Sequence, residues 1–420
     1  MLITLLTAGS RGDVQPYIAL GVRLQQKGCR VRLAASENFE ALVTDYGLEF
    51  HALPGDISEI IKDPMIRGAA EADNPLKVIL NFQTMRNYAQ SLQQGFQQEY
   101  YAACKSAEAI VYHPGAVIGY FIAQQMKIPS ILATPFPMIP TKEYPALIFY
   151  RYNLGKTFNV LTHRLFEQIM WHMSKSAIEQ FWQEKFNTLP PNFANPFPQQ
   201  SNDLTLVACS NYLFPQPANW GQTVRSTGYW FLDAKYDWSP SQELQQFLDA
   251  GEPPVYVGFG SLGDPNKADT TTRLVVEAIL NSGQRGILAT GWGAMKKLSC
   301  LPKQILVVNS VPHAWLFPKM SAVVHHGGAG TTAAGLRAGI PSVIVPHSND
   351  QFAWGQRVWE LGVGAKPIPR KQLTAAKLTT GICSALTEEV KVKAKTLGSK
   401  IRKEGGVEIA ARLIIERVLP

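Results

Sequence analysis

Two histidines followed by a run of glycines are the residues of this chain best suited to bind a phosphate group. They lie in the stretch VVHHGGAGTTAAGLRAGIPSVIVPHSNDQ, residues 323–351. A glycine turn leading into a helix points backbone N–H groups and the positive end of the helix dipole at a ligand, and both favour phosphate. Asp350 and Gln351 close the stretch and offer a carboxylate and an amide to sugar hydroxyls. The stretch therefore predicts a site for a phosphorylated sugar.

The apolar pattern around these histidines predicts the elements that hold them. Short apolar runs at 321–324 and 342–345 have the length of buried parallel strands, and a helix is expected over 331–338. Strand, glycine turn, helix and strand form a βαβ unit, whose ligands gather at the carboxyl ends of the strands. Five strand ends in the second half carry unusual residues that could hold a base, a diphosphate and a sugar: Gly260-Ser261, Trp292, Val311–His313, His325–Gly327 and Asp350-Gln351.

The N-terminus offers a second candidate, the carboxylate of Asp13. A strand is expected over Leu2–Thr7 and a helix from Val14, with the turn AGSRGD between them. The spacing alone favours Asp13 as the cap of this helix. The alternative is that it acts as a base, because a carboxylate whose pKa is raised by burial can take a proton from a hydroxyl. The turn has GxxG rather than GxGxxG spacing, and Glu37 comes too late after the second strand to hold a ribose. A nicotinamide-dependent oxidoreductase therefore stays only as an alternative function.

Strands alternate with helices through both halves of the chain. This pattern predicts an α/β protein with two doubly wound, Rossmann-like domains facing a central cleft. The first domain is expected over 1–232 and the second over 254–398. A polar stretch at 233–253 is interpreted as the linker, and 399–420 as a C-terminal segment, with a helix over 406–418, that packs back on the first domain.

The first domain departs from regular alternation. A loop is expected over 55–75 and a helix over 76–105. Prolines and aromatic residues then crowd 130–190, where a long helix is expected over 149–186. Such aromatic residues are more often core than ligand contacts, but an irregular apolar insertion between strands is also where a lipophilic pocket forms. Both interpretations stay open for this region.

Composition limits the remaining function classes. The 420 residues are 46% apolar and carry a net charge of +8, which suits an anionic substrate or an anionic membrane surface. Five scattered cysteines without a CxxC pair suit a reducing cytosol and predict no metal site or disulfide framework. No apolar run is long enough for a transmembrane helix, and the first residues lead into a strand pattern rather than a signal peptide. We therefore expect a cytoplasmic monomer.

The basic residues are densest at 391–403. We interpret this segment as a solvated helix face; peripheral contact with an anionic inner membrane face is the alternative. No aromatic residues are interleaved with these bases, so nucleic-acid binding is not predicted.

Three motifs resemble one known family. GSRGDVQPYIAL near the N-terminus, the FGS turn, and VPHAWLFPKMSAVVHHGGAGTTAAGLRAGIPSVIVPHSNDQ are similar to the GT-B nucleotide-sugar glycosyltransferases, in the branch of sterol 3β-glucosyltransferases and bacterial natural-product glycosyltransferases. The resemblance covers nearly the whole chain. It implies inverting transfer of glucose from UDP-glucose to a lipophilic acceptor, first a sterol 3β-hydroxyl and next a flavonoid or macrocyclic aglycone. It also implies that no metal or other cofactor is needed.

The resemblance implies a role for each residue that matches a family motif. His326 would donate a hydrogen bond to the donor's α-phosphate as the nucleoside diphosphate leaves, and Asp13 stands where related plant enzymes carry a catalytic histidine. The other donor-binding residues are Ser261, Gly328, Gly330, Thr331 and Thr332 around the diphosphate, Trp292 and Val311 at the base with His313 beside them, and Asp350 and Gln351 at the sugar. On the acceptor side we place His113, near where plant relatives have an orienting acid, with Phe136 and Met138.

Local alternatives stay open for several of these residues. His313 would otherwise cap the short helix beside it, and Asp350 the helix that follows it. His325 and His347 are more readily explained as strand-end residues with local hydrogen bonds. Ala334 occupies a position where many plant relatives have a ribose-binding glutamate, so the choice between UDP and a deoxythymidine carrier is open. A non-catalytic protein that binds a sugar nucleotide or a lipid is a further alternative.

Overall fold

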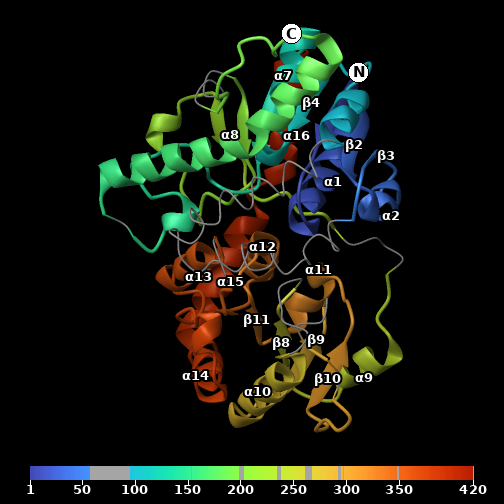
Figure 1. The fold of residues 1–420 in the computed structure, drawn as a ribbon. Helices are drawn as coiled ribbons and strands as arrows, with labels where there is room; N and C mark the ends of the chain where they lie inside the picture. Colours follow the sequence, from blue (N-terminus) through green and yellow to red (C-terminus); the bar gives the residue numbers. More distant parts are fainter. Residues whose placement is uncertain are drawn as a thin grey trace. The chain divides into compact units, whose positions relative to one another are not determined.

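The computed structural model divides the chain into two compact units (Figure 1). Unit 1 comprises Met1–Leu232 together with Glu404–Pro420, and unit 2 comprises Asp233–Lys403. The loop expected over 55–75 and most of the helix expected over 76–105 lie outside the described residues, although residues 95–103 are helical. The residues that the structure describes are 1–56, 95–152, 154–197, 203–233, 238–260, 267–291, 295–296, 298–347 and 350–419.

Unit 1 is built on a sheet of seven parallel strands in the order β3-β2-β1-β4-β5-β6-β7. β1 is wholly buried, as expected for an apolar run at the centre of a parallel sheet. The chain order reverses between β1 and β4, where Leu6 pairs with Tyr112, and doubly wound sheets bind ligands at such a switch point. The strands are β1 Leu2–Leu6, β2 Arg30–Ser36, β3 Glu49–Leu53, β4 Ala109–Tyr112, β5 Ser130–Thr134, β6 Thr205–Val207 and β7 Val224–Ser226.

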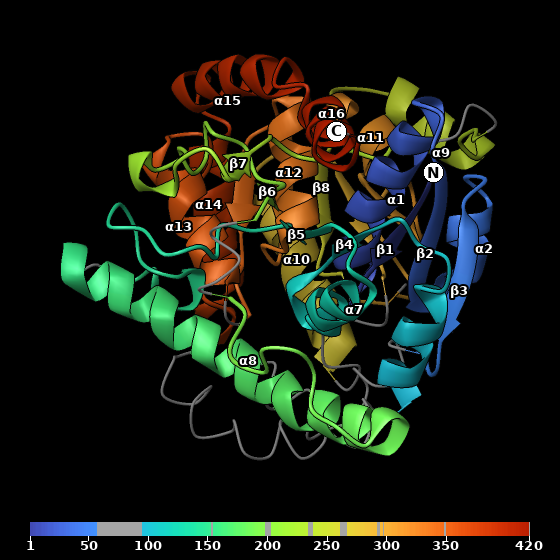
Figure 2. The same ribbon diagram turned by 90° about the horizontal axis from the view of Figure 1, so that it is seen from above.

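Helices cover this sheet (Figure 2). The longest, α8, begins at Lys156 instead of Phe149, because Gly155, at φ +99°, separates it from the preceding short helix. Its Trp171 and Trp182 are buried, as the core interpretation predicts. The α-helices are α1 Arg11–Gln26, α2 Glu40–Thr44, α7 Ile118–Met126, α8 Lys156–Phe186 and α16 Gly406–Val418, with 3-10 helices η1 Glu37–Phe39, η2 Pro114–Ala116, η3 Leu147–Phe149 and η5 Ala218–Trp220.

The last helix, α16, packs beside α1. Ala410 and Ile414 of α16 join the hydrophobic core that α1 forms with the sheet. Glu408 pairs with Arg23, and with Lys27 at 2.8 Å. The end of the chain is therefore part of unit 1.

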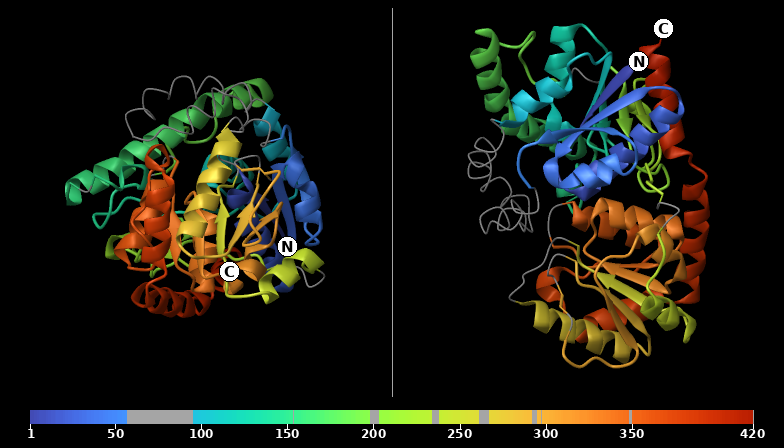
Figure 3. Two further views of the ribbon diagram at one scale, coloured as in Figure 1. Left: turned by 90° about the horizontal axis from the view of Figure 1, so that it is seen from below. Right: turned by 90° about the vertical axis from the view of Figure 1, so that its right-hand side faces the viewer.

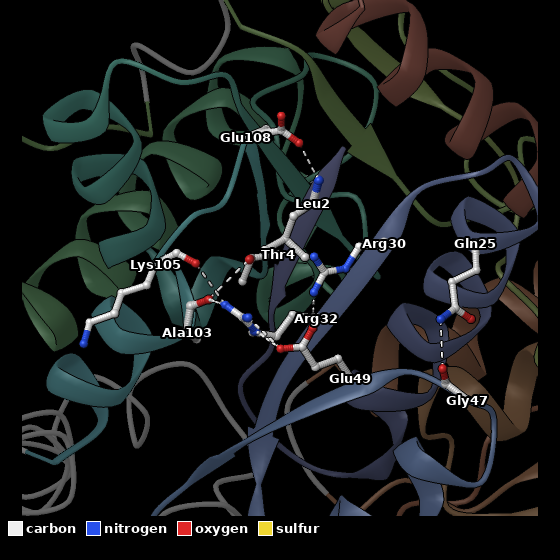
Figure 4. Close-up of polar contacts among 10 residues, drawn as sticks. All are labelled: Leu2, Thr4, Gln25, Arg30, Arg32, Gly47, Glu49, Ala103, Lys105 and Glu108. Atoms are coloured by element: carbon white, nitrogen blue, oxygen red, sulfur yellow. Dashed lines mark hydrogen bonds and ion pairs between the residues drawn. The ribbon is translucent and has the colours of Figure 1, made fainter.

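Polar contacts tie the strands of unit 1 to the segment that enters β4 (Figure 4). The guanidinium of Arg32 donates to the backbone oxygens of Ala103 at 2.7 Å and Lys105 at 3.0 Å. Its Nε donates to Glu49 Oε1 at 2.7 Å, which joins β2 to β3. The Thr4 hydroxyl donates to Ala103 O at 3.4 Å. These contacts fix β1 and β4, the two strands that lead to Asp13 and His113.

Unit 2 is built on a sheet of five parallel strands in the order β10-β9-β8-β11-β12. Helices lie on both faces of this sheet (Figure 3). Alternate residues of β8 belong to different cores: Val255 and Val257 pack with α10 and α14, and Tyr256 packs with α9, α11 and η7. The strands are β8 Val255–Gly258, β9 Gly286–Ala289, β10 Ile305–Val308, β11 Ala322–His325 and β12 Ser342–Ile344. The helices are α9 Gln242–Asp249, α10 Ala268–Asn281, α11 His313–Leu316, η7 Phe317–Lys319, α12 Ala329–Ala338, α13 Gln351–Glu360, η8 Arg370–Gln372, α14 Ala375–Ala385 and α15 Glu388–Arg402.

The last helix, α16, has the predicted bounds of 406–418. The C-terminal segment was expected to begin at residue 399, but α15 continues to Arg402 and the break comes at Gly405, whose φ of +68° is left-handed. Glycine adopts this conformation without steric cost. No helix in the described parts of the chain is long and apolar enough to span a bilayer.

Candidate active site

Asp13 occupies the third position of α1, directly after β1. Its Oδ2 accepts hydrogen bonds from the backbone N–H of Ser10 at 2.8 Å and from the Ser10 hydroxyl at 3.1 Å. Ser10, not Asp13, is the N-cap, and α1 begins at Arg11 instead of Val14. The prediction that Asp13 itself caps the helix is therefore wrong. A carboxylate at this third position reaches back to the N-cap instead, as in a capping box.

Gly9 allows this carboxylate to lie over the turn. Its φ is +117°, and a Cβ built there would lie 2.4 Å from Asp13 Oδ2. Any side chain at position 9 would therefore displace the carboxylate. Sequence reasoning missed the roles of Gly9 and Ser10, although the spacing of a serine and an acid three residues later was a signal for the capping box.

His113 faces Asp13 from the end of β4. Its Nδ1 accepts the backbone N–H of Gly115 at 3.0 Å, so the proton of the neutral imidazole is on Nε2. Nε2 lies 3.7 Å from Asp13 Oδ1. This nitrogen is buried and has no hydrogen-bond partner among the residues that the structure describes. The sheet thus brings together the predicted base and the predicted acceptor-side histidine.

Burial sets the charge of both groups. It raises the pKa of Asp13 to about 6, opposed by the hydrogen bonds from Ser10. It lowers the pKa of His113 to about 3. At neutral pH Asp13 is therefore an anion beside a neutral imidazole. Since its side chain keeps 30% of its surface exposed, the carboxylate can act as a base whose pKa lies near the working pH.

In unit 2, His326 follows β11 at the start of the glycine turn. Gly327 has φ +92°, and Gly328 is the N-cap of α12. The imidazole lies between two glycines: an added Cβ would approach its ring to 2.8 Å from Gly260 and to 2.5 Å from Gly328. Burial lowers the pKa of His326 to about 4, so it is neutral at physiological pH. A neutral imidazole in this position can donate one N–H to a phosphate oxygen.

The first turn of α12 supplies the backbone donors. Gly330 and Thr331 lie in this turn, where helix N–H groups have no intrahelical acceptor. Thr332 does not serve in the predicted way. Its side chain is fully buried, and both its N–H and its hydroxyl donate to Gly328 O at 2.9 Å. Neither group is left to donate to a diphosphate.

Of the two neighbouring histidines, His325 forms a local side-chain hydrogen bond, as the alternative interpretation predicts, whereas His347 Nε2 is buried without a hydrogen-bond partner among the described residues. His325 Nδ1 accepts the N–H of Gly327 at 3.1 Å, and burial holds its pKa well below the usual range. Burial lowers the pKa of His347 to about 3, assisted by the positive charge of Arg370. Sequence reasoning missed Arg370, because no motif marks it. It brings a cation to a strand edge where the three imidazoles are neutral.

The predicted sugar-binding pair begins α13. Gln351 is buried, and its Oε1 accepts the N–H of His347 at 2.8 Å. Asp350 Oδ2 accepts from the indole N–H of Trp354 at 2.8 Å. Asp350 precedes the helix as its N-cap, but its side chain makes no capping hydrogen bond. Both side chains are thus held in fixed positions beside the strand ends.

The other predicted site residues have different surroundings. His313 is the first residue of α11 rather than its cap, and its ring stacks on Phe317 with centroids 4.3 Å apart. Phe136 is half-buried and makes an edge-to-face contact with Phe166, with ring centroids 6.1 Å apart. Met138 is fully buried, and its contact with the acceptor stays a prediction. Val311 is half-buried after β10.

Two predicted donor contacts, Ser261 and Trp292, lie outside the described residues. Within the described ranges, no three His, Cys, Asp or Glu side chains form a group that could hold a metal ion. A metal-independent reaction therefore stays a prediction.

Two family models match this chain, one in each half. Residues 3–145 match the glycosyltransferase family 28 N-terminal domain, and residues 275–413 match the C-terminal domain of the erythromycin biosynthesis protein CIII-like family. Two sterol 3-beta-glucosyltransferases of Arabidopsis thaliana are 34% and 33% identical over 97% and 100% of this chain, which spans 66% of the length of each. A sterol 3-beta-glucosyltransferase of Yarrowia lipolytica is 35% identical over 99% of this chain, which spans 28% of its length.

Solved structures share the fold. The glycotransferase of kitacinnamycin has a TM-score of 0.73 at 21% identity and covers 100% of this chain and 99% of its own. A Streptomyces sp. SF2575 glycosyltransferase complexed with thymidine diphosphate has a TM-score of 0.65 at 17% identity, with 99% of each chain covered. These structures show the GT-B fold. The two family models, which together match more than half of the residues, show that the chain belongs to the glycosyltransferases, among relatives of the sterol 3-beta-glucosyltransferases.

Proposed function

We propose that this chain transfers glucose from UDP-glucose to the 3β-hydroxyl of a sterol, with inversion, giving a β-glucoside. Its sterol 3-beta-glucosyltransferase relatives support the acceptor class. The observation that carries the proposal is the Asp13 carboxylate, whose pKa is raised to about 6 while Ser10 holds one of its oxygens. The family assignment excludes the alternative of a nicotinamide-dependent oxidoreductase.

Asp13 is the proposed base. Its Oδ2 is occupied by the N–H and hydroxyl of Ser10, so Oδ1 takes the proton of the acceptor hydroxyl. The acceptor oxygen then attacks the anomeric carbon from the side opposite the diphosphate. The bond from that carbon to the phosphate oxygen breaks, and the bonding pair leaves with the nucleoside diphosphate. One displacement inverts the configuration, which turns an α-linked donor into a β-glucoside.

Unit 2 would stabilise the leaving group. The oxygen that leaves gains negative charge, and fixed N–H donors aimed at such a charge lower the barrier. His326 offers one ring N–H, and the first turn of α12 offers backbone N–H groups with the helix dipole behind them. Asp350 and Gln351 would hold the sugar hydroxyls. The proposal uses no metal ion.

The test is an acceptor and donor screen on the purified chain. Sterols with a 3β-hydroxyl, flavonoids and macrocyclic aglycones are each incubated with UDP-glucose or deoxythymidine diphosphate glucose, with and without EDTA. Products are identified by mass, and the anomeric configuration by nuclear magnetic resonance. We expect an EDTA-insensitive sterol β-glucoside from UDP-glucose. Glucosylation of the other aglycones with no sterol product would assign the chain to natural-product glycosylation instead. Nucleotide-sugar binding without transfer or hydrolysis would show a non-catalytic binding protein.

A further inference from the structure

Large apolar side chains are exposed around the start of α8, the longest helix of unit 1. The exposed fractions are 43% for Tyr152, 75% for Leu154, 61% for Leu161 and 41% for Leu165. We call these four residues the α8 apolar face. Figure 2 shows α8 along the outside of unit 1, with its N-terminal end projecting past the other helices of that unit. Water-exposed leucines this close together are the mark of an interaction surface.

The charges around the α8 apolar face are basic. Arg151, Lys156 and Arg164 are exposed beside it. Between residues 144 and 178 the sequence has one acid, Glu167, whose side chain is 2% exposed and paired with Arg164 at 3.0 Å. Two exposed acids, Glu143 and Glu179, lie just outside this range. The surface at the α8 apolar face itself therefore presents apolar groups with more basic than acidic side chains, which complements a surface of anionic lipid headgroups.

The opposite face of α8 is fixed to the protein. Asn159 Nδ2 donates to Lys142 O at 3.0 Å. The ring nitrogens of His163 lie 2.9 Å from Met138 O and 3.0 Å from Tyr144 O. These contacts order the helix and join it to the segment that follows β5, which also carries Phe136. The exposed leucines take no part in this anchoring, and the contacts of the described residues do not account for them.

The basic segment at 391–403 is less suited to a membrane. It lies on α15, where Val392 is the large apolar residue exposed, at 53%. Glu389 of the same helix pairs with Lys393 at 2.6 Å and reduces the local positive charge. α15 therefore offers charge without an apolar surface of comparable size.

We propose that the α8 apolar face, with Arg151 and Lys156, docks on an anionic lipid bilayer. A helix with leucines on one side and basic residues beside them lies in the plane of the interface, with the leucines at the boundary of headgroups and acyl chains and the bases on the headgroups. Docking would hold the segment after β5 close to the bilayer. The proposal does not depend on the proposed reaction, because vesicle binding is measured without donor or acceptor.

The experiment is co-sedimentation of the full chain with vesicles of phosphatidylcholine alone or mixed with phosphatidylserine. We expect binding to the mixed vesicles that weakens as salt rises. The triple variant Leu154→Ser, Leu161→Ser, Leu165→Ser should bind at least about tenfold more weakly, because it removes the apolar contribution. Its matched control is the double variant Leu189→Ser, Leu280→Ser, at leucines exposed by 51% and 37% elsewhere, which should bind like the unmodified chain.

Charge reversal separates the two basic surfaces. Arg151→Glu with Lys156→Glu should abolish binding to the mixed vesicles, whereas Lys391→Glu with Lys395→Glu should leave most of it. The opposite pattern would overturn the proposal in favour of α15. Unchanged binding by the triple variant, or equal binding to both kinds of vesicle, would also overturn it. Light scattering gives a further test. If the unmodified chain were a dimer and the triple variant a monomer, a second copy of the chain would cover the α8 apolar face, and the proposal would be overturned.

Activity assays on dispersed and on vesicle-borne sterol distinguish membrane docking from the proposed catalytic function. The triple variant should glucosylate a detergent-dispersed sterol at the normal rate but lose activity on sterol in vesicles. Asp13→Asn should lose activity on both and bind vesicles normally. Equal loss by the triple variant on dispersed and vesicle-borne sterol would place the leucines in the acceptor site and overturn membrane docking.

Discussion

Asp13 and His113 lie 3.7 Å apart, from Oδ1 to Nε2, yet no pH makes both of them charged. Burial lowers the pKa of His113 to about 3 and raises that of Asp13 to about 6. Between these values both groups are neutral, and above them only the carboxylate is charged. The contact is therefore between an anion and an N–H dipole, not an ion pair. It tightens to a hydrogen bond when the two groups approach by a few tenths of an ångström.

Replacing Asp13 by asparagine should remove the base and keep the shape. The amide oxygen of the introduced side chain can still accept the N–H of Ser10, so α1 should remain capped. We expect kcat for the sterol to fall about 10²- to 10⁴-fold, the usual contribution of a general base. UDP binding, measured by calorimetry, should not change. Activity above a tenth of normal would show that Asp13 is not the base.

The pH profile should report the same carboxylate. Asp13 must be ionised to accept a proton, so kcat/KM should rise with pH through about 6 and level off above it. His113 and Tyr17, which face it, stay neutral across this range, because burial lowers the pKa of the first and raises that of the second. A rate profile between pH 5 and 8 measures this limb. A profile that is flat down to pH 5 would contradict the assignment.

Asp13→Asn should also stabilise unit 1 at high pH. The folded pKa of Asp13 is about 6, above the ordinary value of 3.8, so its favourable contribution is present below 3.8 and is lost as pH rises through 6. At pH 8 the free energy of unfolding of the variant should exceed that of the unmodified chain by about 1–2 kcal/mol. This is less than the full pKa shift of Asp13 implies, because the side chain is partly exposed. The gain should vanish near pH 4. Urea unfolding at both pH values measures it, and equal stability at pH 8 would contradict the raised pKa.

Two substitutions separate the two ring nitrogens of His113. His113→Asn keeps an acceptor for the N–H of Gly115 but loses the donor to Asp13, whereas His113→Gln can keep that donor and loses the acceptor. If His113 positions Asp13, the asparagine variant should move the acid limb to higher pH and lose about tenfold in kcat/KM. The glutamine variant should keep the limb and lose about 1 kcal/mol of stability. The reverse pattern would show that His113 has only a structural role.

The position of the His326 imidazole can be tested by substituting a neighbouring glycine. Gly328 has φ −61° and ψ 141°, which alanine adopts without strain, but its Cβ would lie 2.5 Å from His326 Nε2. Gly328→Ala should move the imidazole and lower kcat/KM about 10²-fold, as a displacement of about 1 Å can. Gly330→Ala, on the same helix turn, places its Cβ in open space and should cost far less. Equal losses in the two variants would separate His326 from the reaction.

The sequence predicted the parts of the site that depend on chain continuity. Apolar runs such as LITLL became buried parallel strands, and the glycine turn before α12 follows from the residues themselves. Side-chain placement within the turns was harder. The sequence allows Asp13 to be either the N-cap of α1 or the third helical residue of a capping box with Ser10. The start of α1 at Arg11 makes Ser10 the N-cap and Asp13 the third residue.

Irregular segments were the least predictable. Met138 lies in a stretch rich in prolines, where no periodicity indicates which side chains face inward, and it is buried. The hydroxyl of Thr332 could have faced a ligand or its own helix, and it donates to Gly328 O. Both choices depend on packing between segments far apart in the sequence, which the local pattern does not contain.

The return of the chain to unit 1 has a consequence for its biosynthesis. The core of unit 1 includes Ala410, Ala411 and Ile414, which the ribosome adds only after all of unit 2. After residue 232 has been made, unit 1 must wait without α16 while all of unit 2 is translated, on the order of ten to forty seconds. During that time the apolar side of α1 that α16 will cover stays open to chaperones and to other nascent chains. Unit 1 can therefore be completed only after unit 2 has been synthesised.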